Sequence, residues 1–340
     1  MTFGASDLLT YALAFVVALG ITLFVTPLAR TFALKVGAVD HPNERKVHSD
    51  PVPYLGGLAI VFAFAVSVAG GGIVRGLGSA YLEAAAILGG GLVLSLMGLW
   101  DDLKVVPGWI KVPLELALGA GLFVVGVKAQ LFGIWPLDLI VTMAWVIGVT
   151  NAVNYMDNMD GLTAGIVTIA SAVFFALAVT SGQVFVAGLC IALAGCALGF
   201  LWHNRPPAKI FMGDAGSLFM GFLLAALGLE LRFDNIVRIT FLVPVAVMAV
   251  PVLDALLVSF SRMRQGASPI KPGNDHISHR LVHIGIPPKA AVGLLYAAAI
   301  ACGWIGIVIA FSAPLTAYLL MGWLIAMGLF FAWLLLKVRL

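Results

Sequence analysis

The sequence predicts an all-α polytopic membrane protein with about eleven transmembrane helices. Two features of the composition indicate this class: 62% of the 340 residues are hydrophobic and only 10% are charged. A third is the recurrence of uncharged apolar stretches of about 20 residues, the length of helix that spans about 30 Å of hydrocarbon. A soluble protein would show amphipathic stripes instead, because one face of each helix would meet water.

Each apolar stretch predicts one helix, and polar residues, Gly and Pro interrupt the chain between stretches. The longest polar segments, 30–54 and 261–289, are too short for a soluble domain, so residues 1–340 are expected to form a single integral-membrane domain. The expected helices cover residues 7–29, 55–74, 82–100, 112–129, 134–150, 161–180, 183–202, 215–231, 236–260, 290–311 and 314–337.

The distribution of Lys and Arg predicts the orientation. The first stretch lacks the positive start of a signal peptide, so we interpret it as a retained helix. No Lys or Arg precedes it and four follow it before the second stretch, which places the N-terminus outside. Continuing through eleven spans puts fifteen of the nineteen basic residues, all six histidines and the C-terminus on the cytoplasmic face of the plasma (inner) membrane.

Two further features exclude other classes. Cys190, Cys196 and Cys302 lie in apolar stretches without CxxC spacing, so we expect them to be packing residues. The net charge of +3 is modest and follows from the topology, so no nucleic-acid partner is expected.

Two adjacent carboxylates, Asp101 and Asp102, end the third stretch where hydrocarbon meets water. Adjacent anions repel unless a proton or cation lies between them, which favours a divalent metal or a general base. The alternative is a pair of solvated acids at a helix end, with Lys104 as their partner.

The next motif repeats oxygen-bearing side chains every three residues: Asn151, Asn154, Asp157 and Asp160. If the segment is helical, these side chains share one face and suit a hard cation or a nucleotide. Capping of the following helix would explain Asp160 but not the whole stripe.

Three other polar segments suit anions or metals. The glycines of Phe211-Met-Gly213-Asp214-Ala-Gly216 allow a phosphate or metal to approach the backbone, although Asp214 could be an N-cap. Asp275-His276-Ile-Ser278-His279-Arg280 could bind a diphosphate or anionic lipid headgroups. The loop from Asp40 to Gly57, with Arg45, Lys46 and His48, is interpreted in the same way.

Together these motifs resemble the polyprenyl-phosphate N-acetylhexosamine-1-phosphate transferase family, with phospho-N-acetylmuramoyl-pentapeptide transferase as a more distant relative. The resemblance runs from about residue 35 to 289 and rests on the motifs DHPNERKVHSDPVPYLGG, WDDL, NAVNYMDNMDGLTAG, FMGDAGSL and DHISHRLVHIG.

The resemblance implies a reaction that depends on Mg²⁺, with Mn²⁺ as an alternative. An N-acetylhexosamine 1-phosphate, by default that of N-acetylglucosamine (GlcNAc), would pass from a UDP-sugar to undecaprenyl phosphate with release of UMP. This step would initiate a cell-envelope polysaccharide such as lipopolysaccharide or teichoic acid. The family also makes a homodimer an expectation. Another UDP-amino sugar, or a polyprenyl chain of another length, stays open as an alternative.

The resemblance also implies residue roles. Asp101 would be the base that deprotonates the lipid phosphate, with Asp102 supporting the metal site. The expected metal ligands are Asp214 and Asn154, the expected nucleotide contacts are Phe211, Asp157, Asp160 and Asn151, and the expected phosphate contacts are His276, His279, Arg280, Arg45, Lys46 and His48. Ser278 replaces a frequent histidine, Asn158 replaces a frequent glycine, and Lys104 is one residue closer to the acids than the lysine of the peptidoglycan enzyme.

Two alternatives stay open in mechanism and class. The lipid phosphate could attack the UDP-sugar directly, or a carboxylate could first form an aspartyl phosphate. A secondary transporter would also carry acids in its membrane helices, but it would place them near mid-span, whereas most acids here lie at one face. The Asp spacing of the transferases that act on CDP-alcohols is absent.

Overall fold

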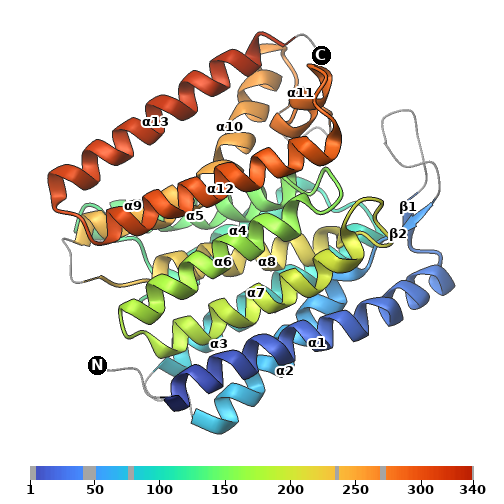
Figure 1. Cartoon of the computed structure of the whole chain (residues 1–340), viewed down its shortest axis with the longest axis horizontal. Coiled ribbons are helices and arrows are strands. Elements are labelled where there is room, and N and C mark those ends of the chain that lie inside the picture. The colour runs from blue at the N-terminus through green and yellow to red at the C-terminus, as the bar shows by residue number, and fades with distance from the viewer. Residues whose placement is uncertain (1–4, 41–50, 76–79, 234–236, 269–272, 339–340) are drawn as a thin grey trace.

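The computed structural model describes residues 5–40, 51–75, 80–233, 237–268 and 273–338, and these form a bundle of long helices (Figure 1). The elements are α1 (Ala5–Val36), β1 (Val39–Asp40), β2 (Val52–Pro53), α2 (Gly56–Arg75), α3 (Tyr81–Leu103), α4 (Gly108–Val124), α5 (Trp135–Tyr155), α6 (Leu162–Thr180), α7 (Val184–Asn204), α8 (Gly213–Glu230), α9 (Val237–Val247), α10 (Ala249–Arg264), α11 (Ile277–His283), α12 (Pro288–Ala310) and α13 (Pro314–Leu336). The two short strands pair antiparallel, Val39 with Pro53 and Asp40 with Val52.

The helices confirm an all-α polytopic membrane protein. In the described part of the chain, eight helices are long and apolar enough to cross a membrane, and the bent pair α9–α10 raises the number to nine. α2 adds a shorter apolar helix over Gly56–Gly71, and α4 has 17 residues. Every expected stretch thus contains a helix, while the number of spans and their orientation stay predictions.

The stretch expected as one helix over 236–260 is instead two helices that meet at an angle of 73°. Pro251 has no N–H to donate to the carbonyl of Val247, and its ring crowds that carbonyl, so the helical ladder breaks there. Met248 lies at the break. The bend gives α10 a direction of its own and brings its polar residues to α11.

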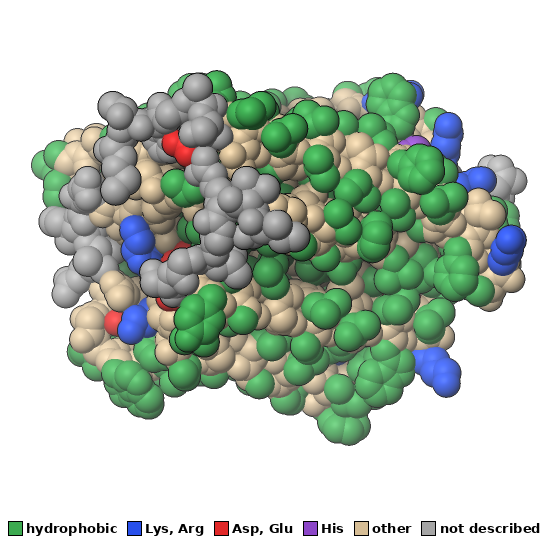
Figure 2. Space-filling view, turned by 90° about the horizontal axis from the view of Figure 1, so that it is seen from below, with side chains coloured by type: hydrophobic (Ala, Val, Ile, Leu, Met, Phe, Trp, Pro, Cys, Tyr) green, Lys and Arg blue, Asp and Glu red, His purple; other side chains and the backbone are tan. Residues whose placement is uncertain are grey.

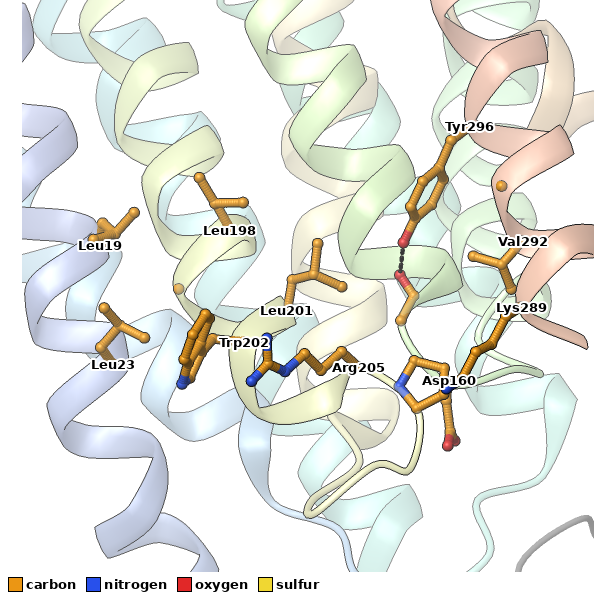
Figure 3. Close-up of a pocket in the computed structure, with 14 residues that line it drawn as sticks. Leu19, Leu23, Asp160, Leu198, Leu201, Trp202, Arg205, Lys289, Val292 and Tyr296 are labelled. Carbon is orange, nitrogen blue, oxygen red and sulfur yellow. Dashed lines mark hydrogen bonds between the residues drawn. The ribbon is translucent and has the colours of Figure 1, made fainter.

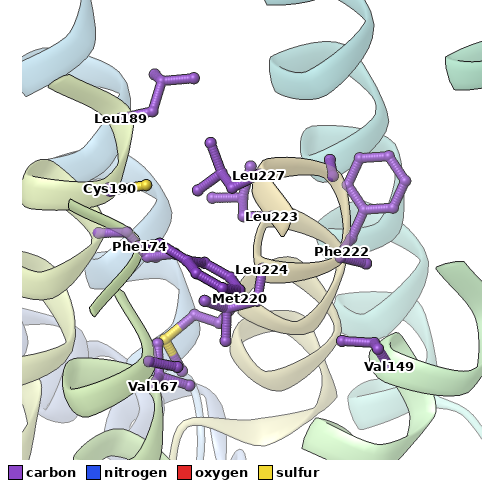
Figure 4. Packing of buried hydrophobic residues seen from close by; sticks show 14 of the residues in the cluster. Val149, Val167, Phe174, Leu189, Cys190, Met220, Phe222, Leu223, Leu224 and Leu227 are labelled. Atoms are coloured by element: carbon purple, nitrogen blue, oxygen red, sulfur yellow. The ribbon is translucent and has the colours of Figure 1, made fainter. Parts of the chain in front are cut away.

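The centre of the bundle is α8, whose residues Ala215–Leu229 are all buried. It packs against α3 and α5. Figure 4 shows Met220 and Leu224 of α8 beside Phe174 of α6 within one hydrophobic cluster. A helix that is apolar on all sides is suited to such a position. α8 therefore provides a fixed base for the polar residues at its N-terminus.

The outer helices present apolar side chains to the surroundings. Leu315, Leu319 and Leu329 of α13 are exposed, as are Leu8 and Phe24 of α1. Figure 2 shows hydrophobic side chains across the middle of one face and charged side chains toward its two ends. This distribution matches a hydrocarbon layer between two polar boundaries.

Candidate active site

Four helices bring together a set of polar side chains that we call the acidic cluster: Asp101 and Asp102 at the end of α3, Lys111 at the start of α4, Asn154 in the last turn of α5 and Asp214 in the first turn of α8. Gly98 makes the approach of α3 to α8 possible, because a Cβ there would lie 2.4 Å from the carbonyl carbon of Asp214.

Lys111 is the cation of this cluster. Its Nζ forms an ion pair with Asp101 Oδ2 and lies 3.6 Å from Asp214 Oδ2. The partner expected from the sequence was Lys104, and the structure corrects this to Lys111, which no motif indicated. The available signal was a lone charge in the first turn of the apolar helix that comes next in the chain after the acids.

Asp102 stabilises the N-terminus of α8. Its two carboxylate oxygens accept hydrogen bonds from the backbone N–H groups of Asp214 (2.8 Å) and Ala215 (3.1 Å). These are donors that a helix leaves unsatisfied at its start, and a negative charge is favourable there. Asp102 therefore positions Asp214 across 112 residues of sequence.

The glycines of the FMGDAG motif serve helix packing, which corrects the expectation of a ligand approaching the backbone. Gly213 has φ of +70°, and a Cβ there would lie 2.5 Å from Asp102 Oδ2. Gly216 lies against α2, since its Cβ would be 2.8 Å from the Cα of Gly57. The backbone donors expected to bind an anion are occupied by the protein's own carboxylate.

Asn154 and Asp214 are in direct contact, as expected of two residues of one site. Asn154 Nδ2 donates to Asp214 Oδ1 (2.9 Å) and to Ser217 Oγ (2.8 Å). Its carbonyl oxygen is used in neither bond. Three carboxylates against one lysine leave the acidic cluster with an excess of negative charge.

The donor set of this cluster fits Mg²⁺. Carboxylate and amide oxygens are its usual protein ligands, and Mg²⁺ is commonly held by one or two carboxylates together with substrate phosphates. Within the described residues, no group of three or more His, Cys, Asp or Glu side chains is arranged to hold a metal alone. Such an ion would thus need oxygen from Asn154 or from a substrate.

The stripe of four polar residues is helical only in part. α5 ends at Tyr155, so Asn151 and Asn154 are helical while Asp157 and Asp160 lie in the following turn. The four residues therefore do not form one helical face.

Each of the other three side chains has its own environment. Asn151 Nδ2 donates to Glu115 Oε2 (2.7 Å), whereas Asp160 Oδ2 accepts from the N–H of Ala208 (2.9 Å). Burial, and then the charge of Asp214, raise the pKa of Asp157 to about 7. The charge of Asp214 in the acidic cluster therefore acts on Asp157.

Phe211 lies where the loop before α8 meets the β2 segment. Its N–H donates to the carbonyl of Pro53 (2.9 Å), and its own carbonyl accepts from the N–H of Gly56 (3.0 Å). The half-buried Phe211 is thereby held two residues before Gly213, at the N-terminal end of α8.

Residues 275–283, which we call the histidine segment, are held by α10. His276 Nδ1 lies 2.8 Å from Asp254 Oδ2, and the N–H of Ile277 donates to Asp254 Oδ1 (2.7 Å). Asp254 is thus a positioning residue, and it belongs to none of the motifs identified in the sequence. Its signal was a carboxylate three residues after a helix-breaking proline, Pro251.

Two residues that depart from the family pattern contact each other. Ser278 Oγ donates to Asn158 Oδ1 (2.7 Å) and lies 3.4 Å from His279 Nδ1. This links the histidine segment to the turn after α5. Burial, and then the charge of His276, lower the pKa of His279. The ring of His279 is therefore kept more neutral than a solvated histidine.

Arg280 differs from the expectation of a phosphate contact. Its guanidinium is buried and donates to the carbonyls of Asp275 (2.8 Å) and Leu335 (2.9 Å) and to Ser261 Oγ (2.9 Å). These contacts join α10, α11 and the end of α13. With its donors used in this way, Arg280 has a structural role. The other expected phosphate contacts, Arg45, Lys46 and His48, lie outside the described residues.

Known proteins resemble this chain along most of its length. A probable undecaprenyl-phosphate N-acetylglucosaminyl 1-phosphate transferase of Bacillus subtilis (strain 168) is 30% identical over 298 residues, which cover 83% of this chain and 80% of the relative. A decaprenyl-phosphate N-acetylglucosaminephosphotransferase of Mycolicibacterium smegmatis is 34% identical over 331 residues, covering 88% and 80%. An undecaprenyl-phosphate alpha-N-acetylglucosaminyl 1-phosphate transferase of Escherichia coli (strain K12) is 29% identical over 306 residues, covering 86% and 81%.

A family model covers the part of the chain from which the site is built. The model of glycosyl transferase family 4 matches residues 84–232, the part of the chain that contains the whole acidic cluster. Both comparisons agree with the family that the motifs indicated. The protein is therefore a membrane transferase that belongs to glycosyl transferase family 4.

Proposed function

We propose that this protein transfers N-acetylglucosamine 1-phosphate from UDP-GlcNAc to undecaprenyl phosphate, with release of UMP. The product would be undecaprenyl diphosphate N-acetylglucosamine, the first intermediate of a cell-envelope polysaccharide. The observation that carries the proposal is the acidic cluster at the ends of four membrane helices. The names of the relatives, each a transferase that acts on a polyprenyl phosphate, support it.

The location of the cluster suits two substrates of unlike solubility. A lipid phosphate can reach it from the membrane, while a nucleotide sugar can reach it from water. We assign this face to the cytoplasm because the positive-inside distribution of Lys and Arg favours it. The whole chain then acts as one integral-membrane domain in the plasma membrane.

Each residue of the cluster has a distinct task in this proposal. Asp101, oriented by Lys111 and by the N–H of Val106, takes the proton from the lipid phosphate. Asp214 and Asn154 would hold Mg²⁺, which when bound offsets the negative charge of the reacting phosphates. Lys111 adds a fixed positive charge close to both Asp101 and Asp214.

Residues around the cluster bind the donor. Phe211 would stack on the uracil, with Asp157, Asp160 and Asn151 on the nucleoside side. His276, oriented by Asp254, and His279 would contact the diphosphate. Because His279 has a lowered pKa, it enters the site largely neutral and can accept a hydrogen bond.

The decisive experiment measures UMP release by purified protein given UDP-GlcNAc, undecaprenyl phosphate and Mg²⁺, with and without EDTA. We expect release that stops with EDTA and returns with excess Mg²⁺ or Mn²⁺. Equal UMP release with and without EDTA would refute the proposal that the reaction depends on a divalent metal ion. If UDP-GlcNAc gives no UMP but another UDP-amino sugar does, the proposed reaction is supported and its donor is that other sugar nucleotide.

A second experiment separates the two mechanisms. We favour direct attack by the lipid phosphate on the β-phosphorus, because Asp101 and Asp102 are both held by donors in the structure. Incubation with UDP-GlcNAc alone should then leave the protein unmodified. An Asp101 or Asp102 that carries N-acetylglucosamine 1-phosphate on its carboxylate, formed with release of UMP and detected by mass spectrometry, would establish the two-step route instead.

A further inference from the structure

A groove lies between α1, α7 and α12, away from the acidic cluster. It has a volume of about 730 Å³, in the range of about 300 to 1,000 Å³ typical of ligand pockets. Figure 3 shows its walls: Leu19 and Leu23 come from α1, Leu198 from α7 and Val292 from α12. The walls are aliphatic and belong to membrane-spanning helices, so they suit a hydrocarbon chain.

One end of the groove carries cations. Arg205 follows α7 directly and Lys289 lies in the first turn of α12. The guanidinium of Arg205 lies over the ring of Trp202, 3.8 Å from its centre, a cation–π contact. Asp160 also lines this end, with its Oδ2 bound to the N–H of Ala208. An aliphatic groove that ends at an interfacial Trp, Arg and Lys has the chemistry of a lipid phosphate site.

We propose that this groove binds an anionic phospholipid of the surrounding membrane, with an acyl chain between α1 and α12 and its phosphate at Arg205 and Lys289. No member of the acidic cluster lines the groove in the described structure. A lipid substrate seated here would therefore hold its phosphate away from the reacting groups. A second copy of the chain would bury two cations against the single carboxylate of Asp160, which leaves one positive charge without a counter-ion.

The bound lipid would stabilise the turn after α5. Tyr296 lines the groove, and its hydroxyl donates to the carbonyl of Gly161 (2.6 Å). Gly165 is its close neighbour, since a Cβ there would lie 2.1 Å from the Tyr296 hydroxyl. Gly161 directly follows Asp160, so the lipid packs against the support of this turn. The proposal of lipid binding depends only on the groove, and it is independent of which sugar the protein transfers.

The test counts lipids retained by the purified full chain in native mass spectrometry, with phosphatidylglycerol as the probe and phosphatidylcholine of the same acyl chains as its comparison. We expect one phosphatidylglycerol per chain to be retained preferentially. The pair Arg205→Gln and Lys289→Gln should lower its affinity roughly tenfold or more, since each basic residue near a phosphate contributes about 1 kcal/mol. The matched pair Lys35→Gln and Arg264→Gln changes two exposed cations outside the groove and should retain the lipid.

A second variant fills the groove without changing charge. Gly293 lines it, and a Cβ there would have no neighbour within 4 Å, so Gly293→Leu adds a side chain without a clash. Gly322→Leu, equally open but on α13, is its control. We expect Gly293→Leu alone to lose the lipid.

Three outcomes overturn the proposal. Retention by both groove variants places the lipid elsewhere. A preference for undecaprenyl phosphate over phosphatidylglycerol that both groove variants abolish makes the groove a substrate site. A dimer that only Gly293→Leu converts to monomer, with lipid binding unchanged, assigns the groove to a second copy of the chain.

Discussion

The acidic cluster and the histidine segment are connected through the turn at residues 156–161, yet they differ in how their charges are paired. In the acidic cluster the carboxylates outnumber the cations, whereas in the histidine segment each carboxylate has a partner. The cluster leaves three carboxylates with one lysine, Lys111. In the histidine segment and its support, Asp254 binds His276 and Arg262 binds Asp275 through two nitrogens. The first region is thus arranged to receive a cation, and the second is arranged to hold a shape. The predictions below test this difference.

Removal of an acid from the cluster should have the largest effect. We expect Asp214→Asn, and separately Asp101→Asn, to reduce UMP release by at least about a hundredfold, because the first variant loses a ligand of the Mg²⁺ that would offset the phosphate charge and the second loses the base. Size-exclusion chromatography would verify that each variant stays folded. Near-normal release by either folded variant would contradict the assignment of that residue.

Replacement of Lys111, the lysine of the acidic cluster, should have the second largest effect on turnover. Lys111→Gln removes the ion pair with Asp101 and the charge near Asp214, so we expect roughly a hundredfold loss of turnover. Lys104→Gln, a change of the exposed lysine that directly follows α3, is the matched control and should lower turnover less than about threefold. Equal losses in both variants would refute the distinction between the two lysines.

A smaller effect is expected in the histidine segment, where Asp254 orients His276 and also holds the backbone of Ile277. Asp254→Asn should lower turnover about tenfold, since it weakens the bond that orients the ring. The double variant Asp254→Asn with His276→Gln should be no slower than His276→Gln alone. A double variant that is about tenfold slower still would show that Asp254 acts independently of His276.

The smallest effect concerns stability. Asp157 has a pKa raised to about 7 by burial and by Asp214, so the folded protein binds its proton more tightly than the unfolded chain does. The free energy of unfolding should therefore fall as pH rises from about 4 to about 7. Asp157→Asn removes the part of this dependence that Asp157 contributes and should raise Tm by a few degrees at the upper end. Thermal unfolding of both proteins in EDTA across this range is the measurement, and parallel curves would refute the shift.

The sequence by itself determined the helices. Hydropathy adds up over about 20 neighbouring residues, so each apolar stretch predicts its own helix without knowledge of its partners. The residue types of the site were also recognisable, because carboxylates, asparagines and histidines are unusual at membrane depth. Asp101, Asp102, Asn154 and Asp214 were all identified in this way, and the structure brings them together.

The tertiary structure alone decided which side chains meet and what each contact does. Lys111 replaced Lys104 as the partner of Asp101, and Asp254 became the support of His276. The guanidinium of Arg280 points into the protein, where it donates hydrogen bonds to the carbonyls of Asp275 and Leu335. These outcomes depend on how helices cross, and the contacts join residues 60 to 112 positions apart at Asp214 alone. Local pattern cannot specify such pairs, because side-chain packing between helices selects the approach and glycines such as Gly98 permit it.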